Sequence, residues 1–144
     1  MRPVLDATAI VALLDGEVGG PEVAAVLRPG AVASSVNMAE ARDILMRQLG
    51  KGAEGARAMD ELVRRGLEVV PCDLRLATDA ADLRTAHYNG KQFPVSIADC
   101  IGVATARQVG GALVSSDADQ CTLAVLAGVD VHPIANSFGV RPDV

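Results

Sequence analysis

Short apolar runs alternate with longer amphipathic segments along the chain, and this alternation constrains the fold more than any other sequence feature. The apolar runs have the length and β-branched content of strands and lie at residues 3–7, 30–36, 67–73, 111–117 and 129–134. The segments between them predict helices at residues 8–16, 19–28, 37–50, 52–66, 74–90, 96–110 and 119–128. Strands separated by helices form parallel βαβ units, so the pattern predicts a doubly wound α/β sheet. The 144 residues show no repeat or linker, which predicts one domain over residues 1–144.

The composition predicts a globular core that is almost free of aromatic side chains. Half of the residues are apolar, which excludes a disordered chain, and only 2% are aromatic, so Ala, Val, Leu and Ile must build the core. The net charge of −5 disfavours non-specific binding of nucleic acid, because neutralising phosphates requires Lys and Arg. The scarcity of aromatic rings also removes the usual platform for stacking bases. A protein of this composition that acts on a polyanion needs another source of positive charge.

The N-terminal segment and the cysteines predict a cytoplasmic protein. Asp6 interrupts the apolar N-terminus, and the apolar run that follows is too short to span a membrane. Cys72, Cys100 and Cys121 are odd in number, lie far apart and lack the spacing of zinc ligands. We therefore interpret them as reduced, packed thiols.

Five acidic residues occupy positions where a doubly wound sheet places its ligand site. Asp6 ends the first predicted strand, and Asp117 and Asp119 follow the fourth. Glu40 and Asp99 each lie one turn into a predicted helix. Ligand sites in such sheets lie just beyond the carboxyl ends of the strands, so we expect these side chains to face one crevice.

Helix capping is the simplest alternative explanation for most of these acids. The segments 37–40 and 96–99 both fit a capping box, with the cap residue three positions before an acid. Asp117 or Asp119 can cap the helix that follows, and an acid in a first turn stabilises a helix by about 0.3–1 kcal/mol. Capping gives no account of Asp6 in this interpretation.

A bound cation accounts for all of the acids together. Two carboxylates about 5 Å apart repel by roughly 3 kcal/mol at an effective dielectric of about 20, so four together are destabilising without a cation. Oxygen ligands suit Mg²⁺ or Mn²⁺. Such an ion brings a phosphate to an acidic site, activates a water and stabilises the leaving oxygen. Thr8 and Ser115 lie two residues from Asp6 and Asp117 and offer hydroxyl groups that support these ligands.

Four segments in this order resemble the PIN-domain ribonucleases, and more closely the VapC-type toxins of bacterial toxin–antitoxin pairs. The segments are "VLDATAIVALL", "NMAEARDIL", "SIADCIGVATA" and "ALVSSDAD", and the resemblance covers almost the whole chain. It implies a three-layer domain with a mostly parallel central sheet flanked by helices. It also implies an endoribonuclease that hydrolyses RNA phosphodiester bonds with Mg²⁺ or Mn²⁺. The catalytic, metal-binding residues that it implies are Asp6, Glu40, Asp99 and Asp117, with Asp119 as an accessory ligand.

The resemblance further implies three partners, namely an RNA substrate, a cognate antitoxin protein and a second copy of the chain in a homodimer. Thr8 stands where the family commonly has Ser or Thr. The chain departs from the family pattern in two places. Ser115 replaces a commoner Thr, and Gln120 and Cys121 replace an aromatic residue that often follows the last acid. Neither departure touches a predicted metal ligand.

The basic residues allow two interpretations. Ten of the thirteen lie between Arg42 and Arg107, which either concentrates positive charge near a bound RNA or forms salt bridges on helix surfaces. Arg84 is placed to reach the crevice and hold a phosphate bidentately, and the alternative is a solvated or ion-paired side chain. His87 and His132 have no acid at the spacing of a catalytic triad, so we assign them no catalytic role.

Three other classes of protein share parts of this pattern. A phosphatase with an aspartyl nucleophile needs a second acid two residues after Asp6, where Thr8 stands. A receiver domain needs an early acidic pair and a late Lys, and no Lys follows Lys91. The third class is a non-catalytic PIN-fold module that binds RNA or protein. Such a scaffold is expected to lose one or more of the acids, and this chain keeps them all.

Overall fold

Five parallel strands form the single sheet of the protein, and a computed structural model describes all residues from 1 to 144. The strands are β1 (Pro3–Leu5), β2 (Val32–Ser34), β3 (Glu68–Val70), β4 (Ala112–Ser115) and β5 (Asp130–Pro133). They are arranged in the order β3-β2-β1-β4-β5, and every neighbouring pair is parallel. Each of the five strands that the sequence predicts is present, and the predicted doubly wound α/β sheet is confirmed.

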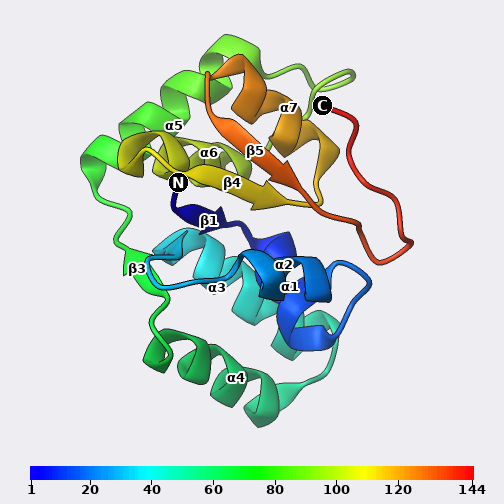
Figure 1. Ribbon diagram of the computed structural model, residues 1–144. Helices are drawn as coiled ribbons and strands as arrows, with labels where there is room; N and C mark the ends of the chain where they lie inside the picture. The colour runs from blue at the N-terminus through cyan, green and yellow to red at the C-terminus, as the bar shows by residue number, and fades with distance from the viewer.

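Seven α-helices connect and flank the strands (Figure 1). They are α1 (Ala7–Asp15), α2 (Gly20–Val26), α3 (Ser35–Asp43), α4 (Gly52–Arg64), α5 (Leu74–His87), α6 (Ile97–Val109) and α7 (Ala118–Leu126). A π-helical turn, η1 (Ile44–Gln48), continues α3. None of the helices combines the length and the apolar character that crossing a membrane requires. The seven predicted helices are all found, with α3 and η1 together replacing the helix predicted over 37–50.

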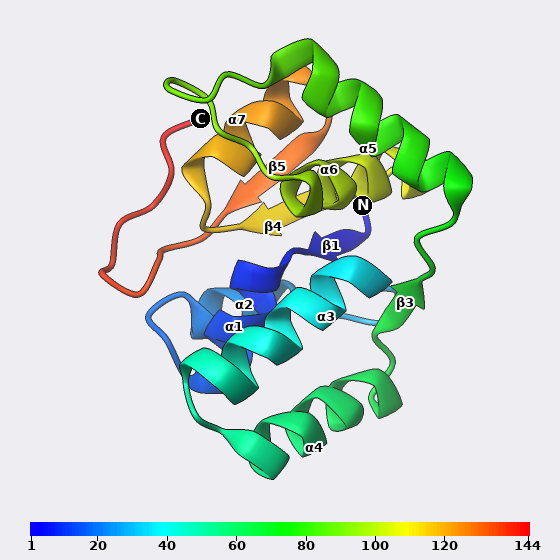
Figure 2. The ribbon, with the colours of Figure 1, turned by 180° about the vertical axis from the view of Figure 1, so that it is seen from behind.

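The two faces of the sheet bury two separate apolar clusters. Val4 and Leu113 point to the face covered by α5, α6 and α7, whereas the neighbouring Leu5 and Val114 point to the face covered by α1 to α4. This alternation follows from the two-residue period of a strand. Figures 1 and 2 show the resulting three layers, with the sheet between the two groups of helices. The three-layer architecture predicted from the family resemblance is therefore confirmed.

The strand order places a topological switch point between β1 and β4. From β1 the chain moves outward through β2 to β3, and it later returns to the other side of β1 as β4 and β5. The connections after β1 and β4 therefore diverge, and the carboxyl ends of these strands open onto a crevice. Asp6 and Asp117 lie at this crevice, because each stands one or two residues beyond the end of its strand.

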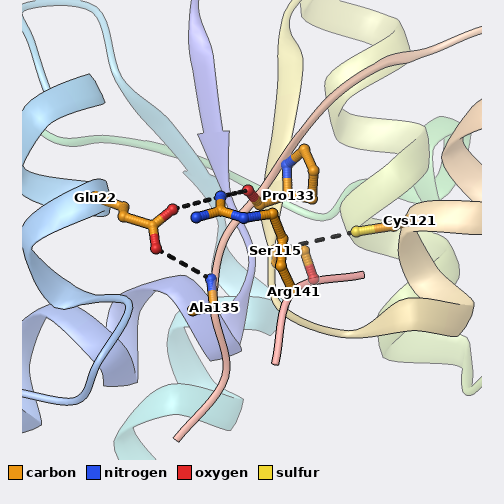
Figure 3. A network of polar contacts seen from close by, with 6 residues as sticks. All are labelled: Glu22, Ser115, Cys121, Pro133, Ala135 and Arg141. Carbon is orange, nitrogen blue, oxygen red and sulfur yellow. Dashed lines mark hydrogen bonds and ion pairs between the residues drawn. The ribbon is translucent and has the colours of Figure 1, made fainter. Parts of the chain in front are cut away.

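The C-terminal segment, which follows β5, is held against α2 by hydrogen bonds to the side chain of Glu22 (Figure 3). Arg141 Nη1 donates to Glu22 Oε2 at 2.6 Å and to the Pro133 carbonyl oxygen at 2.7 Å. The other carboxylate oxygen of Glu22 accepts from the Ala135 N–H at 3.4 Å. A side chain at Gly19 is excluded, because its Cβ atom would lie 2.3 Å from the Ala135 carbonyl oxygen.

The three cysteines are all free thiols, as the sequence predicts. Cys100 and Cys121 are buried, and burial raises the pKa of the Cys100 thiol to about 11 and that of the Cys121 thiol to about 12. Cys121 Sγ also lies 3.6 Å from the Ser115 carbonyl oxygen (Figure 3). Thiols with raised pKa values stay protonated and unreactive at neutral pH, so these two residues contribute packing.

Candidate active site

Asp6 is the most deeply buried carboxylate of the crevice. It follows β1 and caps the N-terminus of α1, where its Oδ1 accepts from the Ala9 N–H at 2.8 Å. Thr8 Oγ1 donates to the same carboxylate at 2.8 Å, and Ser115 Oγ donates from β4. The side chain is only 2% exposed, and this burial raises the pKa of Asp6 to about 7 despite the three hydrogen bonds, which lower it. The expectation that capping gives no account of Asp6 was therefore wrong.

Asp117 and Asp119 stand at the start of α7, directly after β4. Asp117 is the cap of this helix, because its Oδ1 accepts from the Gln120 N–H at 2.9 Å. Its own N–H donates to Ser115 Oγ at 3.0 Å, which ties the turn to the hydroxyl that also contacts Asp6. Asp119 follows two residues later in the first turn of the helix and is partly exposed at the rim of the crevice.

Asp99 takes part in the capping box that the sequence predicts at the start of α6. The Ser96 N–H donates to Asp99 Oδ2 at 2.8 Å, and the Asp99 N–H donates to Ser96 Oγ at 3.0 Å. Burial is the main reason that the pKa of Asp99 is raised, and the charges of Asp117 and Asp119 raise it further. Asp99 therefore both starts its helix and faces the acids that follow β4.

Glu40 is the one acid of the four that caps nothing. Helix α3 begins at Ser35, and its cap is Ser34, whose Oγ accepts from the Asn37 N–H at 2.9 Å. The predicted capping box over 37–40 is therefore wrong, because the helix starts two residues earlier and Glu40 lies beyond its first turn. The pKa of Glu40 is raised by burial first and then by the charges of Asp99 and Asp117.

The four carboxylates converge on one electrostatic environment. The charge of Asp117 raises the pKa of Asp6, Glu40 and Asp99, and the charge of Asp99 also raises that of Glu40. All six ion pairs of the protein involve other acids, so no Lys or Arg compensates this group. The crevice thus gathers negative charge from the ends of β1 and β4, the start of α6 and the middle of α3, and no Lys or Arg of the chain pairs with it.

The carboxylates are not arranged for direct ligation of one ion. No group of three His, Cys, Asp or Glu side chains is placed so that it could hold a metal ion. The capping bonds explain this, since Asp6, Asp99 and Asp117 each turn an oxygen toward a backbone N–H of their own helix. The available donors are carboxylate and hydroxyl oxygens, which suit a hydrated Mg²⁺ or Mn²⁺ that keeps several of its waters. The chemistry of the donors therefore suits such an ion, whereas their placement in this structure does not bring three of them together around one point.

The PIN-domain family matches this chain over residues 4–126. The chain belongs to the PIN-domain family. This stretch contains β1, the sheet core and all four convergent acids. The predicted resemblance is thus confirmed at the level of the family.

Solved structures share the fold of this PIN domain at low sequence identity. The VapC20 toxin of Mycobacterium tuberculosis, described as cleaving the sarcin–ricin loop, has a TM-score of 0.73 and 18% identity, covering 98% of this chain and all of that one. The DNA-bound VapBC structure of Salmonella typhimurium has a TM-score of 0.71 and 16% identity, covering 92% of this chain and 97% of that one. The promoter-bound VapBC2 structure of Rickettsia felis has a TM-score of 0.68, again with 16% identity, covering 92% and 98%. No curated protein sequence matches the chain.

Two buried amides position the acidic turn of α6 in this PIN domain. Gln120 Nε2 donates to the Asp99 carbonyl oxygen at 3.1 Å, and Asn37 Nδ2 donates to the Ala98 carbonyl oxygen at 3.2 Å. Both side chains are almost fully buried. Gly102 permits this approach, because a Cβ atom there would lie 2.5 Å from Gln120 Nε2. Sequence reasoning missed both roles, and the only available signal was Gln120, a polar residue where the family often has an aromatic one.

The hydroxyl of Ser115 connects Gln120 to Asp6. Ser115 Oγ contacts a carboxylate oxygen of Asp6 and lies 3.0 Å from Gln120 Oε1, yet a hydroxyl has one proton to donate. The single proton of Ser115 Oγ is therefore shared between Asp6 and Gln120.

Arg84 lies beside the crevice and forms no ion pair with an acid. Its Nε donates to the Val95 carbonyl oxygen at 2.9 Å, and its guanidinium carbon lies 4.2 Å from the ring centroid of Tyr88. The ion-paired alternative for Arg84 is therefore wrong, and its guanidinium stacks on the Tyr88 ring. His87 ends α5 and His132 lies in β5, and neither hydrogen-bonds to an acid of the crevice.

Proposed function

We propose that this PIN domain is an endoribonuclease that depends on Mg²⁺ or Mn²⁺ and acts as the toxin of a toxin–antitoxin pair. One observation carries the proposal, namely that four carboxylates from four separate elements lie in one crevice with no basic residue paired to them, where burial and the charge of Asp117 raise the pKa of Asp6, Glu40 and Asp99. Such uncompensated groups in a crevice are typical of a functional site rather than of a structural ion-pair network. The family and the shared fold of VapC toxins support the same activity.

Asp6, Glu40, Asp99 and Asp117 are the residues that hold the ion in this proposal, and Asp119 lies at the rim as an accessory. A divalent cation at this place supplies an activated water and neutralises charge on the phosphate that is cut. Because burial raises the pKa of Asp6 to about 7, binding of a cation there would release a proton from part of the Asp6 population at neutral pH.

The surrounding residues orient the ligands. Thr8 and Ser115 hold the carboxylate of Asp6 from two sides, and the Ser116 N–H in turn donates to Thr8 Oγ1 at 2.9 Å. The backbone of Ser96 fixes the carboxylate of Asp99. Outer hydrogen bonds of this kind set the direction of a ligand and are expected to matter nearly as much as the ligand itself.

An antitoxin protein is the partner that the structural neighbours support, because the matched structures from Salmonella typhimurium and Rickettsia felis are described as VapBC assemblies. An uncompensated acidic crevice attracts Arg side chains through charge-assisted hydrogen bonds. We therefore expect a basic segment of the antitoxin to occupy the crevice and compete with metal and RNA. A homodimer is a further part of the proposal. Copurification without a small neighbouring protein, together with normal growth when the chain is overexpressed alone, would count against the toxin role.

A non-catalytic binding module is the second candidate, and a specific observation favours it. Three of the four acids are engaged as helix caps, and no three of them are placed to hold an ion directly. In that case the crevice binds a basic protein segment, and metal has no effect on stability.

Cleavage of total RNA with and without Mg²⁺, mapped by sequencing the ends of the products, separates the two functions. We expect defined cleavage that requires Mg²⁺ or Mn²⁺ and disappears with a chelator. Calorimetric titration with Mn²⁺ gives a second measurement on the same protein. Absence of both cleavage and heat of binding would establish the binding module instead.

A further inference from the structure

A pocket beside the acidic crevice lies between the C-terminal half of α5 and the start of α6. It has a volume of about 280 Å³, and the residues that line it are Ala81, Arg84, Thr85, Tyr88 and Ile97. Ile97 is the first residue of α6, and Asp99 stands two residues later, about 3 Å further along the helix axis. The pocket and Asp99 therefore share the first turn of α6, on different faces of the helix, because residues two apart do not face each other.

Arg84 and Tyr88 form one stacked surface in this pocket. The guanidinium lies 4.2 Å from the ring centroid, and the bond from Nε to the Val95 carbonyl oxygen fixes its plane. The two Nη atoms of Arg84 have no hydrogen-bond or ion-pair partner, and no buried side-chain nitrogen or oxygen of the protein lacks one. The Nη atoms therefore face solvent and are free to donate to a ligand.

The composition makes this surface exceptional within the chain. Tyr88 is the only tyrosine, there is no tryptophan, and the two other aromatic residues are phenylalanines. Tyr88 is 48% exposed, as is Ile97 across the pocket. Six of the thirteen basic residues form ion pairs, and Arg84 is among the seven that do not. A purely structural Arg–Tyr pair on a helix needs neither the exposed ring nor the free Nη atoms.

We propose that this pocket binds one base of a single-stranded RNA, next to the phosphate that is cut in the acidic crevice. The base stacks on the Tyr88–Arg84 surface, and the free Nη atoms of Arg84 donate to the adjoining phosphate. Stacking on aromatic rings and on guanidinium planes is the usual way in which proteins hold unpaired bases. Arg84 also gives this site a positive charge for the RNA phosphate, in a protein whose net charge is −5.

The inference rests on the proposed ribonuclease function, but its central measurement does not require cleavage. Because Tyr88 is the only tyrosine and tryptophan is absent, the intrinsic fluorescence of the protein reports on this pocket alone. Short single-stranded oligonucleotides of uridine, cytidine or adenosine are titrated into the inactive Glu40→Gln protein, with free tyrosine amide as the correction for absorption. We expect saturable quenching by at least one of the three. Absence of quenching at concentrations where the wild type cleaves RNA would overturn the inference.

Substitutions then test the same surface in the wild-type background. Tyr88→Ala is expected to raise the KM for RNA about 5- to 150-fold, the range for loss of one stacked base, and Tyr88→Phe is expected to restore it. Arg84→Ala is expected to weaken binding as well, whereas Arg75→Ala removes an exposed charge from the same helix and is expected to change nothing. Melting temperatures identify any variant that merely unfolds. Equal KM values for the Tyr88→Ala, Arg75→Ala and wild-type proteins refute the base site and leave the ribonuclease proposal standing. If oligonucleotides quench the fluorescence but the wild type cleaves no RNA, the proposed ribonuclease activity is refuted and the pocket remains an RNA-binding site.

Discussion

The acids of the crevice differ from the acids of the outer helices in two respects, which are burial and whether an Arg stands beside them. On the helices, Arg47 lowers the pKa of Asp43, and Arg65 and Arg64 lower that of Glu61. In the crevice, burial and neighbouring carboxylates raise the pKa of Asp6, Glu40 and Asp99. The same residue types thus stabilise the ionised form in one region and disfavour it in the other. A region that gathers charge without compensating it is where a ligand is to be expected.

Glu40→Gln gives the largest expected effect, because Glu40 belongs to the crevice but caps no helix. Cleavage is expected to fall at least about 100-fold, the scale of losing one group that stabilises charge in the transition state. The metal-free protein is expected to melt at the same or a higher temperature, because one member of a repelling cluster becomes neutral. Mn²⁺ raises the melting temperature of the wild type and not that of the variant.

Asp99→Asn is the counterpart of Glu40→Gln at an acid of the crevice that also caps a helix. An Asn side chain keeps an oxygen for the Ser96 N–H, so the stability change is expected to stay within about 1 kcal/mol. Cleavage is again expected to collapse. A variant that melts lower yet cuts RNA normally would assign Asp99 to helix capping alone.

Gln120→Leu is expected to have an intermediate effect, because it removes a residue that positions the crevice but leaves every acid in place. Loss of the bonds to the Asp99 carbonyl and to Ser115 is expected to cost about 1–3 kcal/mol of stability, and cleavage is expected to fall about 10-fold as the turn of α6 loosens. Gln120→Glu keeps the shape but adds a further carboxylate beside Asp6. The second variant is expected to be the more destabilised at neutral pH, as measured by urea unfolding.

The pH dependence of stability distinguishes the two regions without RNA. The pKa of Asp6 rises from its usual value of 3.8 to about 7 on folding, so its contribution is fully present below about pH 4 and is lost as the pH rises to about 7. The metal-free wild type is therefore expected to lose stability across this window, and Asp6→Asn is expected to flatten the profile. The same slope in both proteins would show that Asp6 is already ionised at low pH.

Asp43→Asn gives the smallest expected effect. Asp43 is exposed and pairs with Arg47 at 2.8 Å, one turn away on the same helical segment. Exposed pairs of this kind contribute little to stability, so the melting temperature and the cleavage rate are expected to match those of the wild type. A large loss of cleavage would show that the outer acids also belong to the site.

The sequence was sufficient to predict the strands, the helices and the acidic residues of the crevice, but not the hydrogen bonds that hold these residues. Apolar periodicity located the strands and helices, and the position of Asp6 and Asp117 after two strands followed from it. The start of α3 was misjudged because Ser34 and Asn37 are both residues that favour the cap position. The helix begins directly after β2, which ends at Ser34, so Ser34 is the cap. Gln120 escaped notice because its hydrogen-bond partners belong to other elements, one of them 21 positions away in the sequence.

The contact between Ser115 and Asp6 also sets when the acidic crevice can be completed during synthesis of the chain. The two residues are 109 positions apart, although they lie on adjacent strands. At a synthesis rate of about 5–20 residues per second, roughly 5–20 s separate their appearance on the ribosome. During this interval β1 has only part of its sheet, and Asp6 lacks the hydroxyl that holds it. A growing chain therefore carries an incomplete crevice until Ser115 has been synthesised and β4 has paired with β1.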